Sequence, residues 1–72
     1  MEEETFELNG NEHIELYKLL KVTGFCESGG FAKTIISEGY VYVDGVQELR
    51  KRCKIRAGQK IDLDGNIITV IA

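Results

Sequence analysis

The residues of this sequence best suited to chemistry are five cations within a stretch of seven positions. Arg50-Lys51-Arg52 is followed by Lys54 and Arg56, and the two intervening residues are Cys53 and Ile55. We expect Cys53 and Ile55 to anchor the segment to the sheet and to hold the charges on one side. Preorganised Arg and Lys side chains bind phosphate groups. The run therefore predicts a phosphate-binding surface, although a charge run is more often only a solvated loop.

The distribution of charge favours the functional reading. The net charge is −3 and the pI about 5.0, which alone would argue against a nucleic-acid ligand. Residues 1–17, however, hold six of the acids and no Lys or Arg, whereas residues 18–60 hold all nine basic residues against four acids. A separation of charge this strong within one small chain is informative about partners.

Other residues give little reason to expect catalysis or a metal site. His13 is the only histidine, has no nucleophile near it in sequence, and is expected to be a surface or capping residue. Cys26 and Cys53 are 27 positions apart without a second pair, so Cys and His cannot supply four zinc ligands. We expect two small, buried or half-buried thiols that are reduced and metal-free, and we predict no enzyme activity and no cofactor.

Two glycine-containing motifs invite stronger interpretations than they support. Gly29-Gly30 is expected at the start of a helix, where amide groups can bind phosphate, but the sequence has neither a Walker pattern nor GxGxxG. Close packing of the helix start is the favoured reading. Asp62-Leu63-Asp64-Gly65 resembles a calcium loop only superficially, because its glycine comes fourth rather than sixth. A hairpin turn explains it better.

The elements that must position these residues can be read from periodicity. Residues 12–21 have apolar positions at helical spacing, with Asn11 as a candidate N-cap and Gly24 ending the helix. Ser28 is the candidate N-cap of a second helix, which Gly39 ends in the left-handed conformation. The link between the helices is short, so they should form a hairpin with facing apolar sides.

Strands are predicted before and after the two helices. Residues 5–8 alternate polar and apolar side chains, whereas residues 2–4 are expected to be a frayed, solvated end. Residues 40–43 form a strand that turns at Asp44-Gly45 and pairs back briefly over 46–49. Residues 61–63 and 67–71 flank a second turn at Asp64-Gly65. The predicted fold class is α+β, with a two-helix hairpin packed on a small, mostly antiparallel sheet.

Seventy-two residues allow one domain with a small core. No apolar run approaches the roughly 20 residues of a membrane helix, and the acidic N-terminus lacks the apolar region of a secretory signal. We therefore expect a cytoplasmic protein without a membrane partner.

The segment from Leu20 to Gly45 resembles the RNA-binding motif of the ribosomal-protein-S-four superfamily, also called the alpha-L motif. That motif runs from a leucine-rich helix through Gly-Phe, Ser, Ala, a β-branched pair and Gly to Val-x-Val-Asn-Gly. In this sequence it reads, in register, Leu19-Leu20, Gly24-Phe25, Ser28, Ala32, Ile35-Ile36, Gly39 and Val41-Tyr42-Val43-Asp44-Gly45. The later Gly58-Gln59-Lys60-Ile61 resembles the Gly-Asp-x-Ile turn of the same superfamily.

More narrowly, the whole chain is similar to small stand-alone YbcJ-like members, which join this motif to a basic Arg-Lys-Arg-Cys-Lys segment. The resemblance implies a single RNA-binding domain over residues 1–72, with a motif core at 14–61, and no catalysis. The ligand is expected to be structured RNA, with ribosomal RNA as one candidate, bound by a monomer without a small-molecule substrate.

Two departures from the superfamily pattern move the expected site. Position 29, commonly Arg or Lys, is Gly29, and Asp44 replaces the common Asn. Both changes weaken the usual contact from the helix side. The predicted RNA-binding residues are therefore mainly those of the basic segment, supported by the helix hairpin: Arg50, Lys51, Arg52, Lys54, Arg56, Lys33, Lys21 and Ser28.

Two other classes of protein share features with this sequence. A protein–protein adaptor could use the sheet face and the side chains of Tyr40 and Tyr42, and its binding would respond less steeply to salt than RNA binding does. A small sulfur-carrier protein would need a C-terminal Gly-Gly, whereas this chain ends in Val70-Ile71-Ala72. The sulfur-carrier reading is excluded on that ground.

Overall fold

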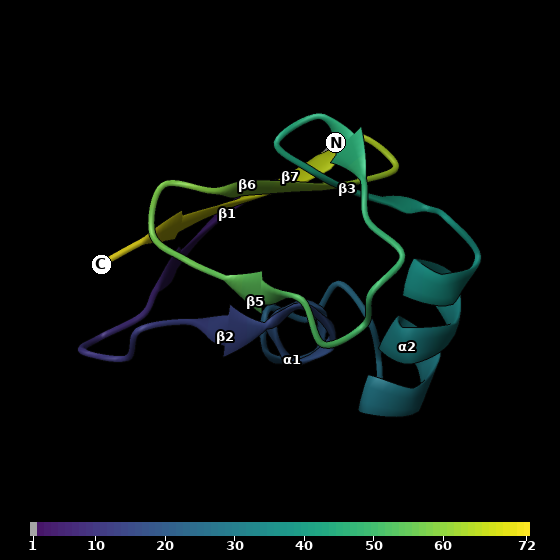
Figure 1. Ribbon diagram of the computed structural model, residues 1–72, viewed down its shortest axis with the longest axis horizontal. Coiled ribbons are helices and arrows are strands. Elements are labelled where there is room, and N and C mark those ends of the chain that lie inside the picture. Colours follow the sequence, from purple (N-terminus) through teal and green to yellow (C-terminus); the bar gives the residue numbers. More distant parts are fainter. Residues whose placement is uncertain (1) are drawn as a thin grey trace.

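A five-stranded sheet with two helices on one face forms the body of the computed structural model, which describes residues 2–72 (Figure 1). The sheet order is β1-β7-β6-β3-β4, and a separate pair joins β2 to β5. The strands and helices are β1 (Glu3–Glu7), β2 (Ile14–Glu15), α1 (Leu16–Val22), α2 (Gly29–Ser37), β3 (Val41–Val43), β4 (Val46–Gln47), β5 (Lys54–Ile55), β6 (Lys60–Leu63) and β7 (Asn66–Ile71). All pairings are antiparallel except that of β1 with β7. The predicted fold class is confirmed.

Strand β1 lies at one edge of the sheet and joins the two ends of the chain. It runs parallel to β7, with Glu3 opposite Ile67 and Glu7 opposite Ile71. The expectation that residues 2–4 form a frayed end is therefore wrong. Hydrogen bonds to β7 keep residues 3 and 4 extended, although the alternating sequence pattern begins only at residue 5. The Glu2 carbonyl also accepts a hydrogen bond from the Ile67 amide at 2.8 Å.

Helix α1 begins four residues later than predicted. Residues Ile14 and Glu15 are extended and pair with Ile55 and Lys54, so the helix starts at Leu16. Asn11 is not the N-cap. Its side-chain amide instead donates to the Leu8 carbonyl at 2.9 Å and closes the turn after β1. Pairing with a strand some forty residues away has overridden the local helical pattern.

Helix α2 begins and ends as predicted. Its N-cap is Ser28, whose hydroxyl accepts a hydrogen bond from the Phe31 amide at 3.1 Å. Gly39 follows the helix with φ +88°, the left-handed conformation that needs no Cβ. The two predicted hairpin turns also form, because Asp44-Gly45 and Asp64-Gly65 all take positive φ values, as a type I′ turn requires.

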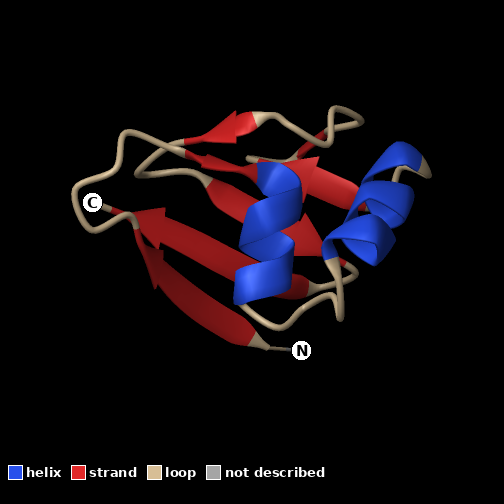
Figure 2. Ribbon diagram, turned by 90° about the horizontal axis from the view of Figure 1, so that it is seen from below, coloured by secondary structure: helices blue, strands red, loops and turns tan. Residues whose placement is uncertain are grey.

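The hydrophobic core lies between the sheet and the two helices, which cover the same face of it (Figures 1 and 2). Helix α1 contributes Leu16, Leu19 and Leu20, each with no exposed surface. The other buried residues come from α2, the strands and the connections: Leu8, Cys26, Ala32, Ile36, Val41, Val43, Ile55, Ile61, Ile68 and Val70. Within residues 2–72, neither helix has the length and apolar character of a membrane span.

Candidate nucleic-acid interface

The basic loop, residues 50–56, is held against the N-terminus of α1. The amide of Leu16 donates to the Cys53 carbonyl at 2.9 Å, and the amide of Tyr17 donates to the Lys51 carbonyl at 3.0 Å. The first amides of a helix have no partner within it and need one elsewhere. Since Glu15 makes no side-chain cap, the backbone of the basic loop takes over that task.

This docking fixes where the charges of the loop lie. Ile55 is fully buried, and Lys54 pairs with Glu15 in the β2–β5 ladder. The prediction that apolar residues hold the segment is confirmed for Ile55, but the anchor is the small β2–β5 pair and the core rather than the main sheet. The cationic side chains of Arg52 and its neighbours are thereby placed beside α1.

Three cations from three segments surround the ring of Tyr17. Nζ of Lys33, on α2, lies 4.6 Å from the ring centre, and Cζ of Arg52 lies 5.6 Å from it. Nζ of Lys18, the next residue on α1, is at 6.0 Å, the outer limit of such a contact. We call Tyr17, Lys18, Lys33 and Arg52 the Tyr17 cation cluster.

The face of Tyr17 offers a favourable contact to both of these cations. A cation over an exposed aromatic face gains about 0.5–1 kcal/mol, which opposes the mutual repulsion of Lys33 and Arg52. The half-buried tyrosine therefore helps to bring together two cations from distant segments of the chain.

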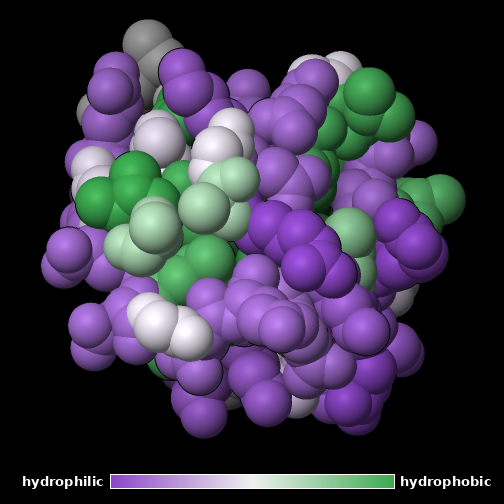
Figure 3. Space-filling model, turned by 60° about the vertical axis from the view of Figure 1, so that its left-hand side comes forward, coloured by the Kyte–Doolittle hydropathy of each residue, from purple (hydrophilic) through white to green (hydrophobic). Residues whose placement is uncertain are grey.

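Next to this cluster, the basic loop forms an open hollow of about 350 Å³. Arg50, Arg52, Lys54 and Cys53 line it. Three of the predicted site residues are therefore together in space as well as in sequence. On the side of the molecule that carries the C-terminus, hydrophilic surface predominates and apolar atoms are confined to patches (Figure 3).

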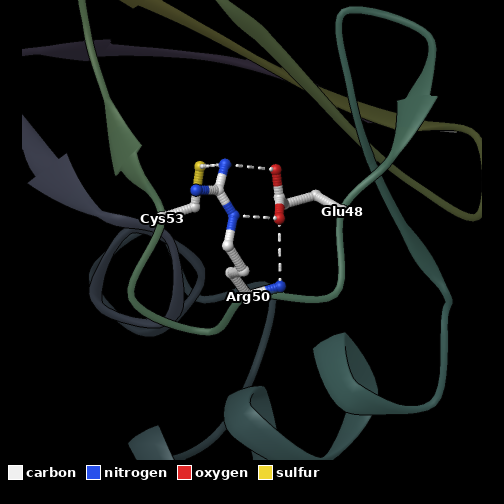
Figure 4. Close-up of polar contacts among 3 residues, drawn as sticks. All are labelled: Glu48, Arg50 and Cys53. Atoms are coloured by element: carbon white, nitrogen blue, oxygen red, sulfur yellow. Dashed lines mark hydrogen bonds and ion pairs between the residues drawn. The ribbon is translucent and has the colours of Figure 1, made fainter.

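Arg50 is less available to a ligand than the other cations of the hollow. Its guanidinium donates to both carboxylate oxygens of Glu48, at 2.9 and 3.2 Å, and its amide donates to Glu48 as well, at 3.0 Å (Figure 4). These hydrogen bonds lower the pKa of Glu48 from 4.5 to about 2. Nη2 of Arg50 also lies 3.7 Å from the sulfur of Cys53.

Arg52 is only loosely paired by comparison. Its Nη1 lies 3.7 Å from Glu15, which also faces Nζ of Lys18 at 3.4 Å. Both cations are more than half exposed, and one carboxylate shared between them in solvent is a weak attachment. Because this pairing is weak, the guanidinium of Arg52 keeps donors available to an anion.

The remaining predicted residues lie outside the Tyr17 cation cluster. Lys51 and Arg56 are exposed, and the amide of Arg56 donates to Oε1 of Gln59 at 2.7 Å. Lys21 is exposed in the last turn of α1. Ser28 uses its hydroxyl as the cap of α2, so this oxygen already has a partner.

The two cysteines and the histidine are at least partly buried. Cys26 is buried and Cys53 half-buried, and burial raises the pKa of both thiols. A thiol with a raised pKa is a poor nucleophile at neutral pH. His13 is half-buried rather than a surface or capping residue, and its Nδ1 is buried with no hydrogen-bond partner among residues 2–72.

Tyr17 is the member of this cluster that sequence reasoning missed. Its position beside the Leu16, Leu19 and Leu20 stripe of the first helix is also what a core residue would have. The local signal was an aromatic residue followed directly by a lysine at the margin of that stripe. The decisive neighbours, Lys33 and Arg52, come from distant segments and could not be placed without the tertiary structure.

Comparison with known proteins agrees with this architecture. Residues 6–71 match the family model of the S4 domain. The chain is 52% identical over 68 residues to YbcJ of Escherichia coli (strain K12), which covers 94% of this chain and 97% of YbcJ, and the match to YbcJ of Shigella flexneri has the same values. The solution structure of E. coli YbcJ, described as revealing an alfaL motif involved in RNA-binding, superposes with a TM-score of 0.75 at 51% identity over 94% of this chain and 86% of that one. A helix hairpin on a mostly antiparallel sheet and a family match over nearly the whole chain lead to one conclusion: this chain belongs to the S4 domain family and carries its RNA-binding fold.

Proposed function

We propose that this protein binds structured RNA by its phosphate backbone, through the Tyr17 cation cluster and the basic loop, and performs no chemistry of its own. Residues 1–72 act as one RNA-binding domain in the cytoplasm, and the protein binds as a monomer. Ribosomal RNA is one candidate ligand. The alfaL motif named for the solution structure of E. coli YbcJ supports RNA as the class of ligand.

The observation that carries this proposal is the meeting of Lys33 and Arg52 over one tyrosine ring. The chain has a net charge of −3, yet Glu15 is the acid that pairs with this cluster among residues 2–72, and it is shared between Lys18 and Arg52. Residues from α2 and from the basic loop are gathered on one surface, beside a hollow lined by further cations. Phosphate oxygens spaced along an RNA strand are the natural counterions of such a surface.

The distribution of binding energy follows from the pairing of each cation. Arg52 and Lys33 are expected to contribute most, because each keeps donors free for phosphate. Arg50 is expected to contribute least, since its guanidinium is held by Glu48. Lys51, Lys54, Arg56 and Lys21 add charge around the contact, and Ser28 acts indirectly by fixing the start of α2.

The test compares three variants that each remove one positive charge: Lys33→Gln, Arg52→Gln and Lys60→Gln. Lys60 is the matched control, because it is an exposed lysine at the start of β6 and belongs to neither the cluster nor the loop. Binding of a structured RNA is measured by fluorescence anisotropy between 50 and 300 mM salt. Each cluster variant should lose affinity and flatten the log–log salt slope by about 0.7 to 0.9 per phosphate contact removed.

A second arm examines the ring itself. Tyr17→Phe retains the aromatic face and should bind nearly as well as the natural protein, whereas Tyr17→Leu should release Lys33 and Arg52 and bind more weakly. Circular dichroism of each variant checks the fold. If Lys33→Gln and Arg52→Gln leave both affinity and salt slope at the Lys60→Gln values, the cluster is not the RNA site and the proposal fails.

A further inference from the structure

A second surface, beside α2 and the β6–β7 turn, differs from the basic loop in both composition and charge. A groove of about 360 Å³ there is lined by aromatic and aliphatic side chains together with Asp64 and Asn66. A neighbouring hollow of about 460 Å³ shares Tyr40 and Asp64 with it and adds Tyr42 and Asp62. We call these two hollows together the aromatic groove.

Three of the four rings that line this groove are exposed to solvent. The exposed fractions of Phe31, Tyr40 and Tyr42 are 53%, 57% and 41%. Aliphatic surface from Ile35 and Leu63, both half-buried, continues the apolar lining beside Phe31 and Tyr40, whereas Tyr42 lies in the neighbouring hollow. Exposed apolar surface gathered in one place and bordered by polar residues is typical of an interaction site.

The charge around the aromatic groove is acidic. Asp62 and Asp64 line it, and no Lys or Arg does. Glu2 lies next to it, since the Glu2 amide donates to Oδ1 of Asn66 at 2.8 Å. Among residues 2–72, no cation forms an ion pair with Asp62 or Asp64. These carboxylates repel phosphate, so the groove is unsuited to RNA.

Helix α2 separates this groove from the Tyr17 cation cluster. Phe31 and Ile35 are one turn apart and face the groove, whereas Lys33, between them in sequence, reaches the Tyr17 ring. The two surfaces therefore lie on different sides of one helix. Ligands of opposite charge can occupy them at the same time.

We propose that the aromatic groove binds a cationic segment of a partner protein, with arginine or lysine side chains alternating with aliphatic ones. The cations would lie over Tyr40 and Tyr42 and pair with Asp62 and Asp64, while the aliphatic side chains fill the groove between Phe31 and Leu63. Charge complementarity selects this partner over an acidic or purely apolar one. The protein would then join RNA on one side to a protein on the other.

The experiment uses the full chain and three short synthetic peptides. The first alternates arginine with leucine, the second replaces arginine by glutamate, and the third replaces leucine by serine. Affinity is measured by fluorescence anisotropy, and the contacted residues are mapped by amide chemical shifts. Only the first peptide should bind tightly, with its largest shifts around Phe31, Tyr40 and Asp64.

Two variants of the groove, each with a matched control, make the test specific. Asp64→Asn keeps the shape and the positive φ of the turn, and Tyr40→Ser removes one ring; each should weaken peptide binding by about fivefold, the loss of one partly exposed contact. Glu27→Gln and Val46→Ser, an exposed acid and an exposed aliphatic residue elsewhere, should leave it unchanged. None of the four should alter RNA affinity by more than the Lys60→Gln control does.

Three results would overturn the proposal. The first peptide could fail to bind, it could bind no better than its glutamate version, or its binding could be indifferent to Asp64→Asn and Tyr40→Ser. Large shifts at Phe31 and Tyr40 on adding a uridine oligonucleotide would instead assign the groove to base stacking. Loss of RNA binding in the cluster variants is a separate result and leaves this test untouched.

Discussion

The Glu48 carboxylate limits how freely the Arg50 side chain can bind a ligand. The carboxylate receives two hydrogen bonds from the guanidinium and one from the Arg50 amide, and it closes the loop between β4 and the basic loop (Figure 4). The first cation of the basic loop is therefore held by a carboxylate of the same chain. Counting cations along the sequence overestimates the number free for phosphate.

The Glu48–Arg50 contact predicts a specific dependence of stability on pH. The pKa of Glu48 falls from 4.5 to about 2 on folding, mainly through the hydrogen bonds from the Arg50 side chain. A lowered folded-state pKa stabilises the protein above pH 4.5, and this contribution is lost as the pH falls from 4.5 toward 2. Glu48→Gln should therefore flatten the fall in urea midpoint over that range.

Urea unfolding at pH 2.5, 3.5, 4.5 and 7, followed by circular dichroism, measures the effect. Glu27→Gln serves as the control, because Glu27 is exposed and makes no ion pair among residues 2–72. If Glu48→Gln and the natural protein lose stability in parallel on acidification, the Arg50 contact does not persist in solution.

Helix α2 and helix α1 show which elements a sequence can define locally. Both ends of α2 follow from residues within or beside it, Ser28 and Gly39, and both were predicted correctly. The start of α1 depends on Lys54–Ile55 and on carbonyls of the basic loop, so the pattern around Asn11 gave the wrong boundary. The parallel β1–β7 pair likewise depends on residues at opposite ends of the chain.

The same difference between local and long-range information applies to the candidate site. The basic loop was visible as a run of charges, and Lys33 was included by its position on the second helix. Their convergence on Tyr17 results from α1 and α2 packing together while the basic loop caps α1. Only the folded chain contains that information.

Gly29, at the start of α2, offers a way to strengthen the interface. A Cβ at this position would lie 3.5 Å from Cδ2 of Tyr17, an ordinary contact, so a side chain fits beside the cluster. Many members of the superfamily resembled by this chain have Arg or Lys there. Gly29→Lys should raise RNA affinity several-fold and steepen the salt slope by about 0.7 to 0.9.

The stability of Gly29→Lys should change little. Replacing glycine in a helix gains up to about 1 kcal/mol, and a cation near the helix N-terminus costs about 0.3–1 kcal/mol. Gly30→Lys is the matched control, since it adds the same charge one position away, where a Cβ meets only the Ser28 hydroxyl at 4.0 Å. Equal gains in RNA affinity from both variants would indicate a general charge effect rather than a defined contact beside Tyr17.

The molecule as a whole is polarised, with acids on β1 and cations on the basic loop and the helices. Its longest extent is 30 Å, several times the Debye length of about 8 Å at physiological salt. The acids of β1 therefore should affect RNA binding only when salt is low. At 10 mM salt the Debye length is about 30 Å, which spans the molecule.

Replacing Glu3, Glu4 and Glu7 together by Gln tests this expectation without deleting the strand. RNA affinity should rise at 10 mM salt and stay unchanged at 150 mM, measured by anisotropy at low protein concentration. A change of equal size at both salt concentrations would place β1 in direct contact with RNA and contradict the separation of charge. Deleting residues 1–4 would be a poorer test, because it would remove part of β1.

The position of β1 at the rim of the sheet also bears on how copies of this protein meet one another. A strand at a rim offers unpaired backbone groups to any second copy, and growth of fibrils begins at such places. Here the exposed carboxylates of Glu3, Glu4 and Glu7 follow one rim, and the opposite rim is the two-residue strand β4. Two copies meeting at the acidic rim should repel each other, so the charges of β1 are expected to oppose edge-to-edge association of this protein.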